Sequence, residues 1–228
     1  MFSLDSRNVY HAKALDDLSW LEHGFGTRIS SGWPDTTDLA SVRQIHSDVI
    51  VAAEHTGCLA EGDALITNRP GITLSIRTAD CLPILMADRK NRVVAAVHAG
   101  WRGVASGIAP KTVQAMADRF GTRPEDLVVA VGPGIGACCF EVGPEVAVQF
   151  QPWFPERDDL SGQTKVDLVE TISRQLRRNK VTVGHIVTAD LCTADPSRAD
   201  LFHSYRRDRE EAGRMTSTIR IRAVRTIE

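Results

Sequence analysis

Short apolar runs separated by polar turns dominate the pattern of this chain. The clearest two lie at residues 82–87 and 93–98, on either side of the polar turn 88–91. Two β-rich runs around such a turn predict a β-hairpin. Similar short runs predict further strands, at 42–53 (which contains His46), 64–67, 127–131, 185–188 and 214–222.

Two longer segments repeat apolar residues at helical spacing. The segment 103–120 is one, and Gly121 follows it as a C′ residue. The segment 166–179 is the other. Strands outnumber helices, and neighbouring strands look hairpin-linked, so the pattern predicts an α+β fold with a mixed, largely antiparallel sheet. A chain of 228 residues is large enough for one good-sized core, so we predict a single domain over residues 1–228.

Composition and charge narrow the range of partners. The chain is 43% hydrophobic and 25% charged, with a net charge of −2, so nothing indicates a nucleic-acid or membrane surface. We see neither an apolar run of the roughly 20 residues that span a membrane nor a signal sequence. The five cysteines are an odd number without framework spacing, as in reduced proteins. We therefore expect a cytoplasmic monomer.

The hairpin brings two reactive residues together. A loop of two or four residues would place Cys81 opposite His98, with Cβ atoms about 5 Å apart. A histidine at this distance can activate a cysteine as a nucleophile. The pair could equally contribute two of the three protein ligands of a catalytic zinc. A third interpretation of the same pair is a buried free thiol beside a hydrogen-bonded core histidine, without any chemical role.

Other motifs are less specific. Gly100 and Gly103 flank Trp101-Arg102 and would let the backbone approach an anion, or they permit a tight turn. The glycine-rich loop 132–136 matches neither a P-loop nor a dinucleotide fingerprint. Three further cysteines lack metal-ligand spacing, and we interpret them as core or loop thiols: Cys138, Cys139 and Cys192.

Taken together, five motifs resemble those of a known family, in the same order. The family is the multicopper polyphenol oxidase (laccase-domain) family, also called the YfiH/LACC1 purine nucleoside phosphorylase family. The resemblance covers roughly residues 20–222. It rests on Gln44-Ile45-His46, Ala79-Asp80-Cys81, His98-Ala99-Gly100-Trp101-Arg102-Gly103, Gly132-Pro133-Gly134-Ile135-Gly136 and Ser204-Tyr205-Arg206-Arg207-Asp208.

The resemblance implies a zinc site formed by His46, Cys81 and His98, of which His46 comes from the family alone. It implies phosphorolysis of adenosine, inosine, guanosine and methylthioadenosine by inorganic phosphate, together with adenosine deamination. The implied fold is a compact α/β sandwich related to cysteine-dependent toxin-type hydrolases. Ser47 departs from the glycine that the family often has after the histidine, and we expect little effect.

Roles for further residues follow as hypotheses. Arg102 and Arg206 are candidates for holding phosphate, and Asp80 for general acid/base chemistry. One alternative is an amide hydrolase that edits cell-wall precursors with Cys81 as nucleophile and His98 as base. Copper is the alternative metal, but seven histidines without an H-x-H pair are few for a multicopper oxidase. A non-enzymatic, zinc-stabilised binding protein is the remaining alternative.

Overall fold

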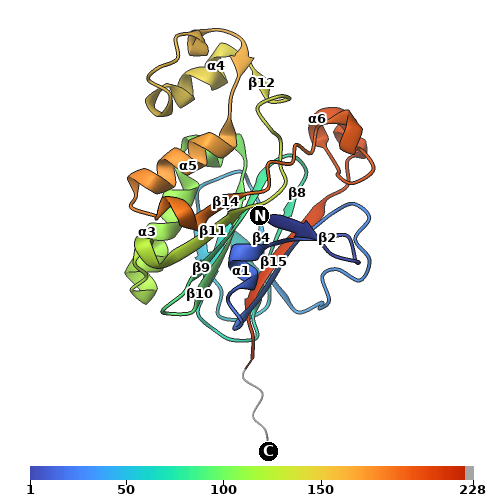
Figure 1. Ribbon diagram of the computed structural model, residues 1–228, viewed down its shortest axis with the longest axis vertical. Helices are drawn as coiled ribbons and strands as arrows, with labels where there is room; N and C mark the ends of the chain where they lie inside the picture. The colour runs from blue at the N-terminus through green and yellow to red at the C-terminus, as the bar shows by residue number, and fades with distance from the viewer. Residues whose placement is uncertain (224–228) are drawn as a thin grey trace, which may run out of the picture.

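The computed structural model describes residues 1–223, which form two packed β-sheets and a layer of helices (Figure 1). One sheet has seven strands, and the other has six. The seven strands lie in the order β1 (Phe2–Leu4), β2 (Val9–Ala12), β3 (Leu21–Gly26), β15 (Met215–Ile221), β8 (Thr73–Thr78), β4 (Leu39–Arg43) and β6 (Gly57–Glu61). The six lie in the order β14 (Ile186–Thr188), β11 (Leu127–Val131), β9 (Leu82–Asp88), β10 (Val93–Ala99), β7 (Ala64–Thr67) and β5 (Ile50–Ala52).

Both sheets are mixed. The pairs β4–β6, β4–β8, β5–β7 and β11–β14 are parallel, and the other pairs are antiparallel. A small third sheet joins β12 (Glu141–Val142) to β13 (Thr164–Lys165). The helices are α1 (Lys13–Asp16), α2 (Trp101–Ala105), α3 (Ile108–Phe120), α4 (Pro144–Ala147), α5 (Leu168–Arg178) and α6 (Tyr205–Asp208).

Side chains of β9 point alternately to its two faces, which explains why one face packs on the other sheet and one on the helices. Leu85 faces the seven-stranded sheet and packs in a buried cluster with Leu74 of β8 and Ile219 of β15. Ile84 points the opposite way, into a cluster that includes residues of α3 and α5 such as Val113. Successive strand residues point to opposite faces, so a central strand buried on both sides must be apolar throughout. Figure 1 shows α3 and α5 on one side of β9 and β10, with β15 and β2 on the other.

The predicted hairpin is present, but its register differs from the prediction by two residues. His98 lies opposite Pro83, and Val93 lies opposite Asp88. Asp88 accepts hydrogen bonds from the amides of Lys90 and Asn91, which closes the turn one position further along than we predicted. Because the side-chain period is two, an even offset keeps Cys81 and His98 on the same face. The two residues are diagonal neighbours, not direct partners.

Two other predictions need correction. His46 lies outside any strand, because β4 ends at Arg43 and β5 begins at Ile50, and its own φ is +59°. The helix predicted over 103–120 is two helices, α2 and α3, because Gly107 adopts a left-handed φ of +78° between them. Gly121 ends α3 with a φ of +69°, as expected of a C-terminal glycine.

The remaining elements agree with the pattern. The helix predicted over 166–179 is α5, and Asp167 accepts a hydrogen bond from the amide of Glu170 at its N-terminus. The mixed α/β architecture is confirmed, whereas the relation to cysteine hydrolases stays a prediction. The single-domain prediction over 1–228 also stays one, and its last five residues lie outside the described part. No helix within residues 1–223 is long and apolar enough to cross a membrane.

The contact between Gly132 and Phe25 gives a stability test. A Cβ at Gly132 would lie 2.2 Å from Cδ1 of the fully buried Phe25. We predict that Gly132→Ala lowers the free energy of unfolding by about 1–3 kcal/mol, as overpacking does. Gly184→Ala is the matched control, because no atom lies within 4 Å of its added Cβ. Equal urea-unfolding midpoints for the two variants would contradict this packing.

Candidate metal centre

Three residues predicted as ligands converge at one end of the two sheets. His46 lies in the loop between β4 and β5, Cys81 precedes β9, and His98 is near the end of β10. Their ligand atoms all lie within 4.8 Å of one another. His98 is buried, Cys81 is half-buried and His46 is exposed. The cluster is therefore anchored on a rigid strand and opens toward solvent.

The buried carboxylate of Asp63 orients His98. Its Oδ1 lies 2.7 Å from Nδ1 of His98, and the amide of His98 donates to the backbone carbonyl of Asp63. Asp63 directly precedes β7, the strand next to β10, and is fully buried. With Nδ1 engaged, His98 has Nε2 available for a ligand. A carboxylate partner on the far nitrogen is what metal-binding histidines usually have.

The same carboxylate shapes the loop that carries His46. It accepts hydrogen bonds from the amides of Ile45, His46 and Ser47, at 3.3, 3.1 and 2.6 Å, and from the hydroxyl of Ser47 at 2.7 Å. These bonds hold His46 in its left-handed conformation. Ser47, which departs from the family pattern, thus adds a hydroxyl donor to Asp63.

Gly100 provides the space in which the cluster closes. A Cβ there would lie 2.9 Å from Nδ1 of His46 and 3.1 Å from Sγ of Cys81. Its φ of −72° is ordinary, so close approach and not backbone conformation requires the glycine. Gly100 thus makes room for the side chains of the cluster, whereas close approach of its backbone to an anion stays a prediction.

Electrostatics favour a charged pair in the metal-free protein. Burial raises the pKa of the Cys81 thiol, but hydrogen bonds from His46 and His98 outweigh it and hold the pKa at about 7. Burial lowers the pKa of His98, but its bonds to Asp63 and Cys81 raise it to about 9. Burial also raises the pKa of Asp63, yet donation from His98 and Ser47 keeps it at about 2. In the metal-free protein, the lowered pKa of Cys81 and the raised pKa of His98 favour a thiolate beside an imidazolium.

The donor set fits a catalytic metal. Two imidazoles and one thiolate are a known ligand set for zinc, which leaves a fourth position open. The same three donors also occur around copper, so the residues alone do not select between the two metals. The open side faces a cavity of about 860 Å³, which is large enough for a small-molecule substrate.

Basic and aromatic side chains line this cavity. Besides the predicted Arg102 and Arg206, its walls include three arginines that the sequence reading did not single out. These are Arg77, Arg209 and Arg214. The aromatic wall residues are Trp101, Phe140 and Tyr205.

The two predicted phosphate ligands, Arg102 and Arg206, differ in exposure and in the contacts that their guanidinium groups already make. Arg102 is exposed, with its guanidinium 4.4 Å from the ring centre of Trp101. Arg206 is half-buried, and its guanidinium donates to the carbonyl of Glu141. Both line the cavity, so the structure brings them to the same space as the metal ligands.

Asp80 also lines the cavity, but its carboxylate already accepts three hydrogen bonds. The donors are the hydroxyls of Thr193 and Ser204 and the amide of Arg206. Asp80 itself has a φ of +82° and is buried. These contacts make Asp80 a positioning residue that joins two distant loops beside Cys81. Its role in proton transfer stays a prediction.

Asp63 is the most important residue that sequence reasoning missed. The available signal was a lone acidic residue immediately before the buried strand run 64–67. Nothing in the spacing shows that this strand lies beside the one carrying His98. Arg77, Arg209 and Arg214 were missed because isolated arginines are ordinarily solvated.

The fold and the cluster together define a class of α/β proteins with a candidate metal centre at the open end of two mixed sheets. Among solved structures, the chain superposes on a YfiH protein from Bacillus licheniformis with a TM-score of 0.85, at 26% identity, covering 97% of this chain and 99% of the other. YlmD from Geobacillus stearothermophilus gives a TM-score of 0.86 at 26% identity, with the same coverage.

Sequence comparisons agree with the structural ones. A family model described as multi-copper polyphenol oxidoreductase laccase matches residues 28–222. A protein from Clostridium acetobutylicum named purine nucleoside phosphorylase is 36% identical, covering 96% of this chain and 93% of its own length. One of the same name from Deinococcus radiodurans is 41% identical, covering 80% and 70%. The chain belongs to this laccase-domain family, as its motifs predicted.

Asp63 provides the sharpest test of the site's construction. In Asp63→Asn, the new NH₂ group takes the place of an oxygen that now accepts hydrogen bonds. It would therefore face N–H or O–H donors and could not replace those bonds. We predict that zinc affinity, measured by chelator competition, falls about 10- to 100-fold. Asp48→Asn is the control, because Asp48 lies on the same loop but pairs with Lys111. Unchanged affinity in folded Asp63→Asn protein would contradict the role of Asp63.

The low pKa of Cys81 predicts its reactivity. In zinc-free protein, the alkylation rate of Cys81 by iodoacetamide should reach half its maximum near pH 7, because the thiolate reacts. Exposed Cys58 serves as the internal reference, with both sites quantified by peptide mass spectrometry. Zinc should protect Cys81 and leave Cys58 unaffected. A midpoint for Cys81 near pH 8.5, the usual value for a free thiol, would refute the charged pair.

Proposed function

We propose that this protein is a zinc-dependent purine nucleoside phosphorylase, in which His46, Cys81 and His98 hold the metal. The observation that carries the proposal is that this cluster and five arginines border one cavity. The names of its relatives support the same activity. The proposed substrates are inorganic phosphate and adenosine, inosine, guanosine or methylthioadenosine.

The arginines suit the phosphate. Phosphate is an anion, and guanidinium groups bind it through charge-assisted, often bidentate, hydrogen bonds. Arg102 and Arg206 remain the proposed ligands, because both line the cavity that the cluster borders. Arg77, Arg209 and Arg214 add positive charge around it, which raises the local concentration of anions.

The aromatic wall suits the purine. Trp101 and Tyr205 belong to the segments that carry Arg102 and Arg206, so a base stacked on them would lie close to a bound phosphate. Aromatic faces bind flat heterocycles with large apolar contact. The hydroxyl of exposed Tyr205 donates a hydrogen bond to Glu210, which restrains the orientation of the ring.

The reaction requires phosphate and nucleoside to be held in line. A phosphate oxygen forms a bond to C1′ of the ribose, the bond from C1′ to the purine nitrogen breaks, and the base leaves with a proton. The products are the free base and ribose-1-phosphate. Holding both reactants in one cavity removes most of the entropic cost of their encounter.

Zinc, when bound, would supply a Lewis acid at the cavity wall. The protein's own residues position the metal ligands and the phosphate-binding arginine. Asp63 fixes the ring of His98 and the loop of His46, so the ligands need little rearrangement to accept a metal. Asp80 holds the backbone of Arg206 toward the same cavity.

Adenosine deamination belongs to the same proposal. Water replaces the amino group at C6 of adenosine, and ammonia leaves. Asp80 stays the proposed acid/base, although its three hydrogen bonds would have to loosen for it to carry a proton. We further propose a monomeric cytoplasmic enzyme whose partners are small molecules, with neither nucleic acid nor membrane among them.

The cysteine-hydrolase alternative rests on one observation. Hydrogen bonding lowers the pKa of Cys81 and raises that of His98, as in a nucleophile and base pair. An amide hydrolase acting on cell-wall precursors would use this pair without a metal. A copper polyphenol oxidase is the weaker alternative, because the described residues form only one cluster with two histidines and a cysteine.

Product analysis separates these functions. We would incubate zinc-loaded protein with adenosine, with and without inorganic phosphate, and separate the products by chromatography. We predict adenine and ribose-1-phosphate only when phosphate is present, and inosine in both reactions. His98→Ala should lose both products, and exposed His55→Ala is the matched control. Absence of any product would refute the nucleoside function and favour the amide hydrolase.

A further inference from the structure

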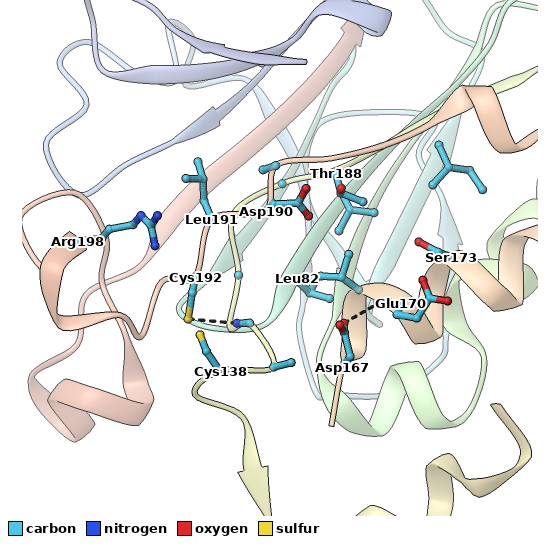
Figure 2. A pocket seen from close by; sticks show the side chains of 18 of the residues that line it. Leu82, Cys138, Asp167, Glu170, Ser173, Thr188, Asp190, Leu191, Cys192 and Arg198 are labelled. Atoms are coloured by element: carbon cyan, nitrogen blue, oxygen red, sulfur yellow. Dashed lines mark hydrogen bonds between the residues drawn. The ribbon is translucent and has the colours of Figure 1, made fainter. Parts of the chain in front are cut away.

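Three thiols form a second cluster away from the proposed zinc centre. Cys138 and Cys139 follow the glycine-rich loop after β11, and Cys192 lies in the loop after β14. Their sulfur atoms all lie within 4.8 Å of one another, and those of Cys138 and Cys139 are 3.6 Å apart. Figure 2 shows the sulfurs of Cys138 and Cys192 turned toward each other across the two loops. From the sequence, these residues are predicted to be core or loop thiols, because their spacing is not that of metal ligands.

Gly136 allows the cluster to form. A Cβ at this position would lie 3.2 Å from Cβ of Cys192 and 3.4 Å from Sγ of Cys138. Its amide donates a hydrogen bond to Sγ of Cys192 at 3.2 Å, drawn as a dashed line in Figure 2. The glycine thus leaves room for the sulfurs and provides a donor to one of them.

The spacing of the sulfurs matches a metal ion bound by three thiolates. Metal–sulfur bonds of about 2.3 Å place the sulfurs of a trigonal or tetrahedral site roughly 4 Å apart. The cluster contains sulfur donors and no imidazole or carboxylate, and such a set selects soft metals, Cu⁺ and Zn²⁺ among them. We propose that Cys138, Cys139 and Cys192 form a second metal site, specific for a soft, thiol-seeking ion. On binding, each thiol releases its proton to solvent as its sulfur bonds the metal.

An ion has a path to this site. Cys138 is exposed, Cys139 is half-buried and Cys192 is buried. Cys138 and Cys192 also line a cavity of about 510 Å³ between α5 and the loop after β14. The cluster is therefore open on one side and closed on the other, as a binding site for an exchangeable ion requires.

A metal at this second site would also stabilise the proposed zinc centre, because hydrogen bonds connect the two sites. Thr193, next to Cys192, donates to the carboxylate of Asp80, the residue before Cys81. The amide of Thr193 also donates to the carbonyl of Gly134, on the loop that leads to Cys138. A metal bound to the three thiols would add a further link between these two loops.

Metal titration tests the site independently of catalysis. We would use reduced full-length Cys81→Ser protein under anaerobic conditions, so that the first centre lacks its thiolate. One sample is titrated with Cu⁺ and another with Zn²⁺, each against a colorimetric chelator. The protected thiols are then counted with a disulfide reagent. We expect one equivalent of at least one of the two ions, with three thiols protected together.

Variants in this background identify the ligands. Adding Cys138→Ser or Cys192→Ser should weaken binding by more than the 10- to 100-fold typical of changes outside the ligand set. Exposed Cys138→Ser is the variant that spares the core, and Cys58→Ser on β6 is the matched control that should bind normally. Failure of both ions to bind, or full binding in the folded Cys138→Ser and Cys192→Ser variants, would overturn the proposal.

Discussion

The buried carboxylate of Asp63 is the interaction on which the candidate metal centre depends. It bonds one ring nitrogen of His98 and three consecutive amides of the loop that carries His46. A buried carboxylate is costly unless hydrogen bonds satisfy it, and here they satisfy it so fully that its pKa is about 2. A single charge therefore sets the positions of two ligands that lie 52 residues apart in the sequence.

The strand order of the six-stranded sheet explains how Asp63 contacts ligands that are distant in the sequence. Asp63 precedes β7, and β7 pairs with β10 so that Ala64 lies opposite Val97. The carboxylate thus emerges beside His98 at the end of the ladder. Cys81 reaches the same end because β9 pairs with β10 on the other side. Because these three neighbouring strands have apolar cores on both faces, their register sets the positions of Cys81 and His98 relative to Asp63.

The sequence pattern predicted much of this arrangement. Runs of apolar residues identified β9, β10, β11 and α5, and the even side-chain period kept Cys81 and His98 on one face despite an offset in register. It could not predict the exact register, because Asp88 closes the turn through its side chain. His46 came from the family motifs alone, since its loop is held by the distant Asp63. The thiol cluster was missed because Cys138 and Cys192 meet only when β11 and β14 pair.

Zinc anomalous diffraction from crystals of the zinc-loaded protein would test the central claim most directly. The account predicts a peak at the cavity wall, about 2.3 Å from Sγ of Cys81 and about 2.0–2.1 Å from a ring nitrogen of His46 and Nε2 of His98. It also predicts that Asp63 keeps its hydrogen bond to Nδ1 of His98. A map of fully loaded protein with no peak among these three residues would contradict the account.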